Sequence, residues 1–172
     1  MQRNEYHKNG WLKLIRALLY ANKMKKYKIG YTQGTFDMFH IGHLNLLHQA
    51  SELCDSLIVG VNTDLLVNEY KHKQPVVNER DRAAIISELR CVDKVVLCDT
   101  LSKTDAWQRL HFEAVFIGSD WKGNERWLQT ERDLKPLGVD VVFLQHTEGV
   151  SSSLLREETG NRVSDDNERS LL

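Results

Sequence analysis

The sequence predicts a single α/β domain built on a doubly wound, five-stranded parallel sheet. Five short apolar runs alternate with segments whose apolar residues recur at helical spacing, and this alternation favours parallel strands joined by helices. The run DSLIVGVN at 55–62 is continuously apolar, as expected for a strand that helices cover on both faces. The chain has 172 residues, of which 41% are hydrophobic, and that is sufficient for one core.

Strands and helices are expected to follow one another along the chain. The predicted strands are 27–32, 55–62, 94–99, 114–119 and 139–145. The predicted helices are 41–53, 63–70, 79–90, 104–112 and 124–138, with a further helix beginning near 153. Gly138 is expected to end the long helix before the fifth strand, and the polar segment 71–78 is expected to be a loop.

Both ends of the chain are expected to lie outside the domain, which we place at 24–160. Residues 1–23 indicate an amphipathic helical extension with an apolar stripe, which either docks on its own domain or adds a dimer interface. Residues 161–172 are polar and are expected to form a flexible tail.

Composition excludes several classes of protein. The net charge is −1, so no global positive field suggests nucleic acid. The three cysteines are odd in number and form no CxxC pair, which favours reduced thiols in a cytoplasmic protein over disulfides or a zinc site. No run approaches the roughly 18 apolar residues that a membrane span requires.

The stretch GTFDMFHIGH at 34–43 lies where the first strand gives way to a helix. A helix N-terminus offers free N–H groups and the positive end of the helix dipole. His40 and His43 are three residues apart, so both imidazoles can lean to one side, and Gly42 lets a ligand approach the backbone. With the Thr35 hydroxyl and a turn that Gly34 frees, this set indicates polyphosphate binding. Two alternatives are a zinc site, which lacks a nearby third ligand, and ordinary surface histidines.

Two further polar motifs follow later strands: GSDWKG at 118–123 and HTEGVSSS at 146–153. In open α/β sheets, ligands bind beyond the carboxyl ends of the strands, at the switch point. The three motifs are therefore expected to meet at one edge of the sheet.

GTFDMFHIGH resembles the signature of the HxGH nucleotidyltransferase superfamily, and HTEGVSSS resembles its second phosphate-binding motif. The pattern is most similar to the cytidylyltransferase branch, whose motifs are GTFDxxHxGH and RTEGIST, and to the bacterial glycerol-3-phosphate cytidylyltransferase type. The resemblance covers about residues 25–158, including RDRAAIISELRCVDKVV and GSDWKG. It implies a Rossmann-like fold.

The resemblance also implies a reaction. CTP and a small phosphorylated alcohol, with glycerol 3-phosphate the first guess, would give a CDP-alcohol and pyrophosphate for a cell-wall or capsule precursor. The acceptor phosphate would attack the α-phosphorus directly, without a covalent intermediate. Mg²⁺ would be held mainly by the triphosphate, and the protein would be a homodimer. Alternatives are an adenylyltransferase of the same superfamily and a nucleotide-binding module without turnover.

Site residues are carried over by the match of motifs. The implied catalytic residues are His40, His43, Arg82, Lys71 and Lys73. The implied nucleotide- and phosphate-binding residues are Gly34, Thr35, Phe36, Asp37, Gly42, Asp120, Trp121, His146, Thr147, Glu148, Gly149, Ser151 and Ser152. Simpler structural roles remain open: a turn for Asp37, core packing for Trp121, a solvated loop for the lysines and helix capping for the serines.

The charges of Arg82 and His146 have specific consequences. Arg82 lies near a predicted helix N-terminus, where a cation opposes the dipole and needs a partner: a phosphate, or else Glu79 or Asp81. His146 stands where the family pattern has an arginine, so a titratable donor replaces a permanently charged one. We expect nucleotide affinity to be more acid-sensitive than in a His146→Arg variant.

Overall fold

The computed structural model describes residues 25–157 and shows an α/β domain around a five-stranded parallel sheet. The strand order is β3-β2-β1-β4-β5, so the chain leaves β1 in one direction and later returns to its other side. This confirms the predicted doubly wound sheet and places the switch point between β1 and β4. The predicted extension at 1–23 and the tail at 161–172 lie outside the described residues.

The strands agree with the predicted runs to within two residues at each end. They are β1 (Tyr27–Gly34), β2 (Cys54–Asn62), β3 (Lys94–Cys98), β4 (Ala114–Gly118) and β5 (Asp140–Leu144). The first strand is longer than predicted because its pairing with β2 continues to the partners Gly34 and Val61.

The helices also follow the predicted order. They are α2 (Ile41–Leu53), α3 (Asp64–Lys71), α4 (Glu79–Ser87), α5 (Lys103–Leu110) and α6 (Glu125–Leu134), with short 3₁₀ turns η1 (Ser119–Trp121) and η2 (Lys135–Leu137). Residues 152–157 are helical as well. The α4 helix ends three residues early because the chain tightens into bonds such as Leu89 N to Ile86 O, 3.2 Å. Pro136 has no N–H to donate, and the predicted long helix changes there to a 3₁₀ turn that ends at Gly138, φ 72°.

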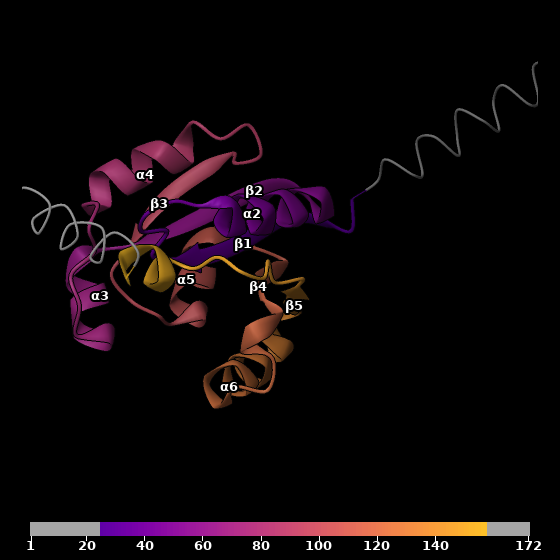
Figure 1. The fold of residues 1–172 in the computed structure, drawn as a ribbon. Coiled ribbons are helices and arrows are strands. Elements are labelled where there is room, and N and C mark those ends of the chain that lie inside the picture. Colours follow the sequence, from indigo (N-terminus) through magenta and orange to yellow (C-terminus); the bar gives the residue numbers. More distant parts are fainter. Residues whose placement is uncertain (1–24, 158–172) are drawn as a thin grey trace, which may run out of the picture.

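Helices cover both faces of the sheet (Figure 1), and each face has its own apolar cluster. Leu47 of α2 and Ile86 of α4 pack with Leu57 and Val59 on one face. On the other face Leu134 of α6 packs with neighbours that include Ala106, Phe112, Val115 and Trp127. Two-sided burial explains the continuously apolar run in β2.

Polar side chains fix where the helices begin. Thr63, Asn78, Ser102 and Asn124 each accept a backbone N–H at the start of α3, α4, α5 and α6. These caps place the loops that follow the strands at the carboxyl edge of the sheet. Within 25–157, no helix has both the length and the apolar character needed to cross a membrane.

Candidate functional site

A cavity of about 370 Å³ opens at the switch point, beyond the carboxyl ends of β1 and β4. All three motifs contribute to its wall, as their positions after β1, β4 and β5 predicted. The predicted site residues that line it are Gly34, Thr35, Phe36, His40, Gly42, His43, Lys71, Asp120, Trp121, His146, Ser151 and Ser152. Asp120 is the one acidic residue in this lining, whereas Lys71, Lys103 and Arg126 are basic, so the cavity suits an anion.

The loop between β1 and α2 is held in an unusual backbone conformation. Phe36 and Met38 both have left-handed torsions, φ 53° and φ 47°, which side-chain-bearing residues rarely adopt. The buried Asp37 between them accepts hydrogen bonds from Val76 N and Val77 N, at 3.0 and 2.9 Å, and pairs with Arg156.

Asp37 is a clamp between segments and does not line the cavity. Burial by itself would raise the pKa of its carboxyl, but the hydrogen bonds from Val77, Val76 and Arg156 together hold that pKa below its ordinary value. The carboxylate thus ties the GTFD loop to the 72–78 segment and to the helix at 152–157. Its contacts are thus with neighbouring segments of the chain and shape the loop beside the cavity, and contact of Asp37 with a nucleotide stays a prediction.

His40 and His43 form a stacked pair at the N-terminus of α2. Their ring centroids are 3.8 Å apart, and His40 Nδ1 accepts the Gly42 N–H at 3.1 Å. That bond leaves the proton of the neutral His40 ring on Nε2, as a donor. A Cβ at Gly42 would lie 2.9 Å from the His40 ring, so a larger residue here would displace the ring.

Both imidazoles are disfavoured as cations in the free protein. Burial and the nearby His146 lower the pKa of His40. Burial, the adjacent His40 and Lys71 lower the pKa of His43 to about 3. His43 Nδ1 is buried without a hydrogen-bond partner among the described residues. The pair is therefore expected to be neutral near pH 7 in the free protein.

The two predicted lysines differ in position. Lys71 ends α3 and lines the cavity, and its Nζ donates to Thr35 Oγ1 at 3.3 Å. Lys73 follows in the exposed 72–78 segment and does not line the cavity. Contact of either lysine with a substrate stays a prediction.

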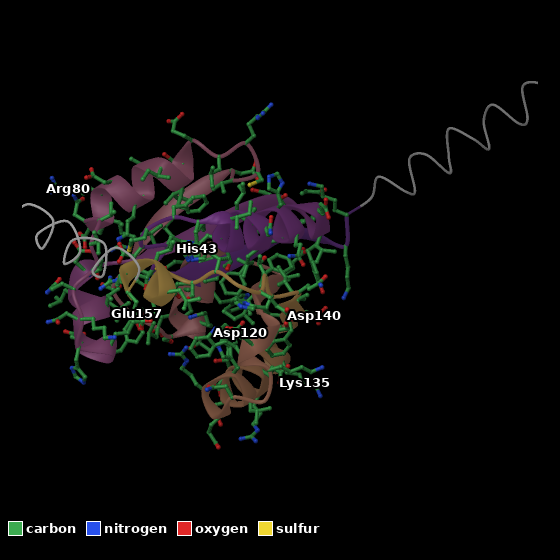
Figure 2. All side chains as sticks on the ribbon, viewed as in Figure 1. His43, Arg80, Asp120, Lys135, Asp140 and Glu157 are labelled. Atoms are coloured by element: carbon green, nitrogen blue, oxygen red, sulfur yellow. The ribbon has the colours of Figure 1, made fainter. Side chains whose placement is uncertain are left out.

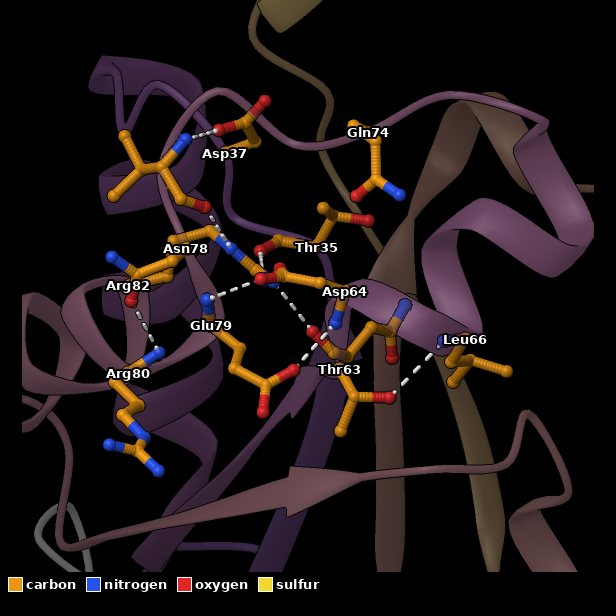
Figure 3. A network of polar contacts seen from close by, with 12 residues as sticks. Thr35, Asp37, Thr63, Asp64, Leu66, Gln74, Asn78, Glu79, Arg80 and Arg82 are labelled. Atoms are coloured by element: carbon orange, nitrogen blue, oxygen red, sulfur yellow. Dashed lines mark hydrogen bonds and ion pairs between the residues drawn. The ribbon is translucent and has the colours of Figure 1, made fainter.

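Arg82 is the most deeply buried cation of the described residues, at 1% exposure (Figure 3). Its guanidinium donates to the backbone oxygens of Val77, Asn62 and Thr35, and it pairs with Asp64 Oδ1 at 2.5 Å. The sequence argument that this cation needs a partner holds, but the acidic partner is Asp64 and neither Glu79 nor Asp81. Arg82 does not line the cavity, and its donors are directed at protein acceptors that hold the loops after β1 and β2.

The HTEGVSSS segment is held by α2 and by the GTFD loop. Asn45 Nδ2 donates to Thr147 Oγ1 at 3.0 Å, and Gln49 exchanges hydrogen bonds with the backbone of Gln145. Ser151 Oγ accepts the Leu154 N–H, as a cap does, and Ser152 Oγ donates to Asp37 O at 2.7 Å.

Three predicted residues of this segment lie outside the cavity wall. Thr147 and Glu148 line a neighbouring hollow of about 530 Å³, together with His146, which lines both. Gly149 lines neither, and it takes the left-handed torsion, φ 77°, that the turn requires.

Asp120, Trp121 and His146 lie at the mouth of the cavity, and all three are partly exposed (Figure 2 labels Asp120 and His43). His146 Nδ1 is 3.6 Å from Asp120 Oδ1, and the Arg126 guanidinium carbon lies 5.1 Å from the centre of the Trp121 ring. Trp121 is therefore a surface residue of the site and does not belong to the core.

Sequence reasoning missed a polar group on the far wall of the cavity. Lys103, at the start of α5, is only 9% exposed and donates to Gln33 Oε1 and Leu101 O, at 2.9 and 2.8 Å. Its Nζ lies 5.6 Å from the centre of the Trp127 ring. Burial, followed by repulsion from Arg126, lowers the pKa of Lys103 to about 8. Within 25–157, no carboxylate forms an ion pair with this cation.

A signal for Lys103 was present in the sequence. It stands just before a predicted helix, where a cation opposes the dipole and needs a partner, as was noted for Arg82. Arg126 and Trp127 also line the cavity, from α6. Trp127 Nε1 is buried and lacks a hydrogen-bond partner among the described residues.

The described residues provide few ligands for a metal ion. Across 25–157, no group of three or more histidine, cysteine, aspartate or glutamate side chains is arranged to hold one. An ion in this cavity would need most of its ligands from a substrate, with Asp120 as the available carboxylate.

The fold is that of the Rossmann-like nucleotidyltransferases. A lipopolysaccharide core biosynthesis protein from Thermoplasma volcanium GSS1 has a similar structure, with a TM-score of 0.59 and 27% identity over 70% of this chain and 97% of that one. The pantoate-beta-alanine ligase of Francisella tularensis, solved with beta-gamma ATP and beta-alanine, shares the fold at 14% identity and a TM-score of 0.52, over 76% of this chain and 64% of that one.

Residues 31–158 match the cytidylyltransferase-like family, and the chain belongs to it. The glycerol-3-phosphate cytidylyltransferase of Staphylococcus aureus (strain NCTC 8325 / PS 47) is 31% identical over 128 residues, which are 74% of this chain and 91% of that protein. The bifunctional protein HldE of Helicobacter pylori (strain G27) is 37% identical over 152 residues, which are 88% of this chain. The chain spans 32% of the length of that HldE protein and 28% of the one from Hyphomonas neptunium.

Proposed function

We propose that the protein transfers a CMP group from CTP to a small phosphorylated alcohol, with glycerol 3-phosphate as the first candidate. The observation that carries this proposal is the stacked His40–His43 pair at the amino end of α2, facing a cavity whose charged lining is mostly basic. A triphosphate next to these rings would meet the positive end of the α2 dipole and the Nε2–H of His40. The likeness to the S. aureus enzyme supports the choice of CTP and of this acceptor.

The reaction proposed is a direct displacement at phosphorus. A phosphate oxygen of the acceptor attacks the α-phosphorus of CTP, the bond from that phosphorus to the bridging oxygen breaks, and pyrophosphate leaves. Such a step needs positioning and stabilisation of negative charge more than a protein nucleophile. His40 and His43 would stabilise charge on the transferred group and the leaving pyrophosphate, and Lys71 would meet the phosphates from the end of α3.

The acceptor phosphate is assigned to the Lys103 wall. A buried ammonium without an ion-pair partner is unfavourable, and a phosphate dianion would supply the missing counter-charge. Arg126, on the same wall, adds a second positive charge. The two substrates would then approach each other from opposite walls of one cavity.

Mg²⁺ belongs to the proposal as a companion of CTP. When bound, it would neutralise charge on the triphosphate, and it commonly keeps several waters and few protein ligands. Asp120 is the lining carboxylate able to reach such an ion. A homodimer is proposed from the family resemblance, and the mass in solution would test it.

The decisive experiment follows pyrophosphate release with each of the four nucleoside triphosphates, Mg²⁺ and glycerol 3-phosphate. Release that requires both CTP and glycerol 3-phosphate is the expected result. Release with ATP would favour adenylyl transfer. Tight binding of CTP without release for any acceptor in a panel of polyol and sugar phosphates would favour a non-catalytic nucleotide-binding module.

A further inference from the structure

A continuous chain of hydrogen bonds runs along the cavity from the loop after β3 to the GTFD loop. Gln33 Nε2 donates to Thr100 O and to Asn62 Oδ1, each at 2.8 Å. Asn62 Nδ2 donates to the Tyr70 hydroxyl at 3.2 Å, and that hydroxyl lies 3.1 Å from Thr35 Oγ1. Nothing in the proposed chemistry uses Gln33, Asn62 or Tyr70, although all three line the cavity.

The direction of the amide bonds in this chain is determined, whereas either hydroxyl could be the donor between Tyr70 and Thr35. A backbone carbonyl only accepts, so Thr100 O requires the amide nitrogen of Gln33 on its side, and the Gln33 oxygen accepts from Lys103 and Tyr31. Because Gln33 donates to Asn62 Oδ1, the Asn62 amide is also fixed. Its NH₂ group must point to Tyr70.

The consequence reaches Thr35. The Tyr70 oxygen already accepts from Asn62, and its own proton needs an acceptor. Among the described residues, Thr35 Oγ1 is the acceptor within hydrogen-bond distance. Lys71 Nζ donates to the same Thr35 oxygen at 3.3 Å. With Tyr70 as the donor, Thr35 Oγ1 accepts two hydrogen bonds, and its own O–H remains to be donated.

We infer that Tyr70 is a positioning residue, itself oriented by Asn62 and Gln33. By donating to Thr35 Oγ1 it leaves the Thr35 O–H free to donate to an anionic oxygen in the cavity. Tyr70 acts through Thr35 and not by touching the ligand. The backbone oxygen of Thr35 is separately held by Arg82, so both the position and the polarity of this hydroxyl are set. This inference rests on the proposed function for the identity of the anion, a phosphate oxygen of the nucleotide.

The test is a double-mutant cycle in the affinity for CTP with Mg²⁺, measured by titration calorimetry on the full chain. Tyr70→Phe keeps the ring over which Lys71 lies, at 5.3 Å, and removes only the hydroxyl. We expect Tyr70→Phe to weaken binding about fivefold and Thr35→Val about tenfold. In the Thr35→Val background, Tyr70→Phe should change affinity by less than about twofold, because the hydroxyl that Tyr70 orients is gone.

Two further variants separate positioning from a merely structural role. Thr35→Ser keeps the hydroxyl, so the Tyr70→Phe effect should return in that background. Tyr27→Phe is the matched control, since the Tyr27 hydroxyl bonds Asp140 at the opposite end of β1, and its CTP affinity should equal that of the wild type. A Tyr70→Phe loss that persists undiminished with Thr35→Val would overturn the inference, as would no loss at all.

Tripolyphosphate serves as a second probe, because it carries the anion without a base. If the wild type binds tripolyphosphate with the same Tyr70–Thr35 coupling but no nucleoside triphosphate, the inference stands and the proposed function fails. If the wild type binds CTP and Thr35→Val binds it equally well, the inference fails and the proposed function stands. If the wild type binds neither probe, both fail. Should Tyr70→Phe fold poorly, Thr35→Val against Thr35→Ser still tests the donor directly.

Discussion

The imidazole rings of His40 and His43 stack with centroids 3.8 Å apart, at the point where the amino end of α2 meets the cavity. Two rings so close cannot both carry charge without strong repulsion, and burial adds to that effect. A polyanion bound beside them would offset both terms. The lowered pKa of each ring favours a neutral pair in the free protein, and we expect a bound triphosphate to make the pair easier to protonate.

Nucleotide binding is expected to take up protons. The pKa of each histidine is lowered in the free protein, and bound phosphate raises it, so uptake should be positive near pH 6 and shrink toward pH 8. Calorimetry of CTP binding in buffers with different ionisation enthalpies measures this uptake. His43→Gln should reduce it, whereas His48→Gln, an exposed change on the same helix, should not. Binding of full affinity with zero uptake at pH 6 would contradict the assigned position of the phosphates.

Acid should destabilise the free protein through His43. The folded-state pKa of about 3 lies below the ordinary value of 6.5, so between these pH values the unfolded chain binds the extra proton. Stability from this site is complete above about pH 6.5 and is lost as the pH falls toward 3. From pH 6.5 to 5 the free energy of unfolding should fall by about 2 kcal/mol on this account. Urea unfolding at both pH values measures the change. His43→Gln should flatten the dependence, and an equally steep curve in that variant would refute the assignment.

Removal of the Arg82 guanidinium should lower the free energy of unfolding more than removal of any single contact in the cavity. Arg82→Met leaves the oxygens of Val77, Asn62 and Thr35 without their donor and Asp64 without its cation. We expect a loss of about 3–5 kcal/mol in the free energy of unfolding. Arg80→Met, an exposed change on the same helix, is the control and should cost less than about 0.5 kcal/mol. Near-wild-type stability of Arg82→Met with lost substrate binding would instead support a direct contact of Arg82 with the substrate.

The replacement of a family arginine by His146 should be visible in a pH profile. His146 lies at the cavity mouth beside Asp120, and an imidazole gains its positive charge only as the pH falls, whereas arginine is always charged. His146→Arg should therefore make CTP affinity less dependent on pH between 6 and 8, and tighter at pH 8 by several-fold. Affinities from calorimetry at three pH values test this. Identical pH profiles of CTP affinity for the two proteins would show that this side chain does not bind the nucleotide.

Local patterns predicted the fold well because each strand is a compact apolar run and each helix begins at a recognisable cap, such as Asn78 or Asn124. Helix ends were less accurate, since α4 ends through tightened turns that leave no glycine or proline signal. For the site, the strand-end motifs were sufficient to locate the cavity. They did not reveal that Asp37 and Arg82 face other parts of the chain, because Asp64 lies 18 residues from Arg82 and Arg156 lies 119 residues from Asp37.

Lys103 and Tyr70 were missed for a related reason. Each is a single polar residue at one end of a short helix, and only the packing of α3 and α5 around β1 brings them to the same cavity. Gln33 connects them through bonds to Lys103 and Asn62. The position of Lys103 near a helix N-terminus was a signal in the sequence, but its contact with Gln33 depends on the order of the strands in the sheet, which no spacing encodes.

Lys103 and its neighbour Arg126 should determine the affinity for the acceptor and leave the affinity for the nucleotide unchanged. Lys103→Met keeps the length of the side chain but removes the charge, so we expect KM for glycerol 3-phosphate, or for the acceptor that the panel identifies, to rise at least tenfold. The dissociation constant for CTP should change less than about twofold. In the wild type, acceptor KM should also rise above about pH 8, where the free ammonium begins to lose its proton, and this rise should be absent from Lys103→Met. Arg109→Met, on an exposed position of the same helix, is the control for stability. An unchanged acceptor KM in Lys103→Met, measured with a folded protein that still binds CTP, would move the acceptor to another wall of the cavity.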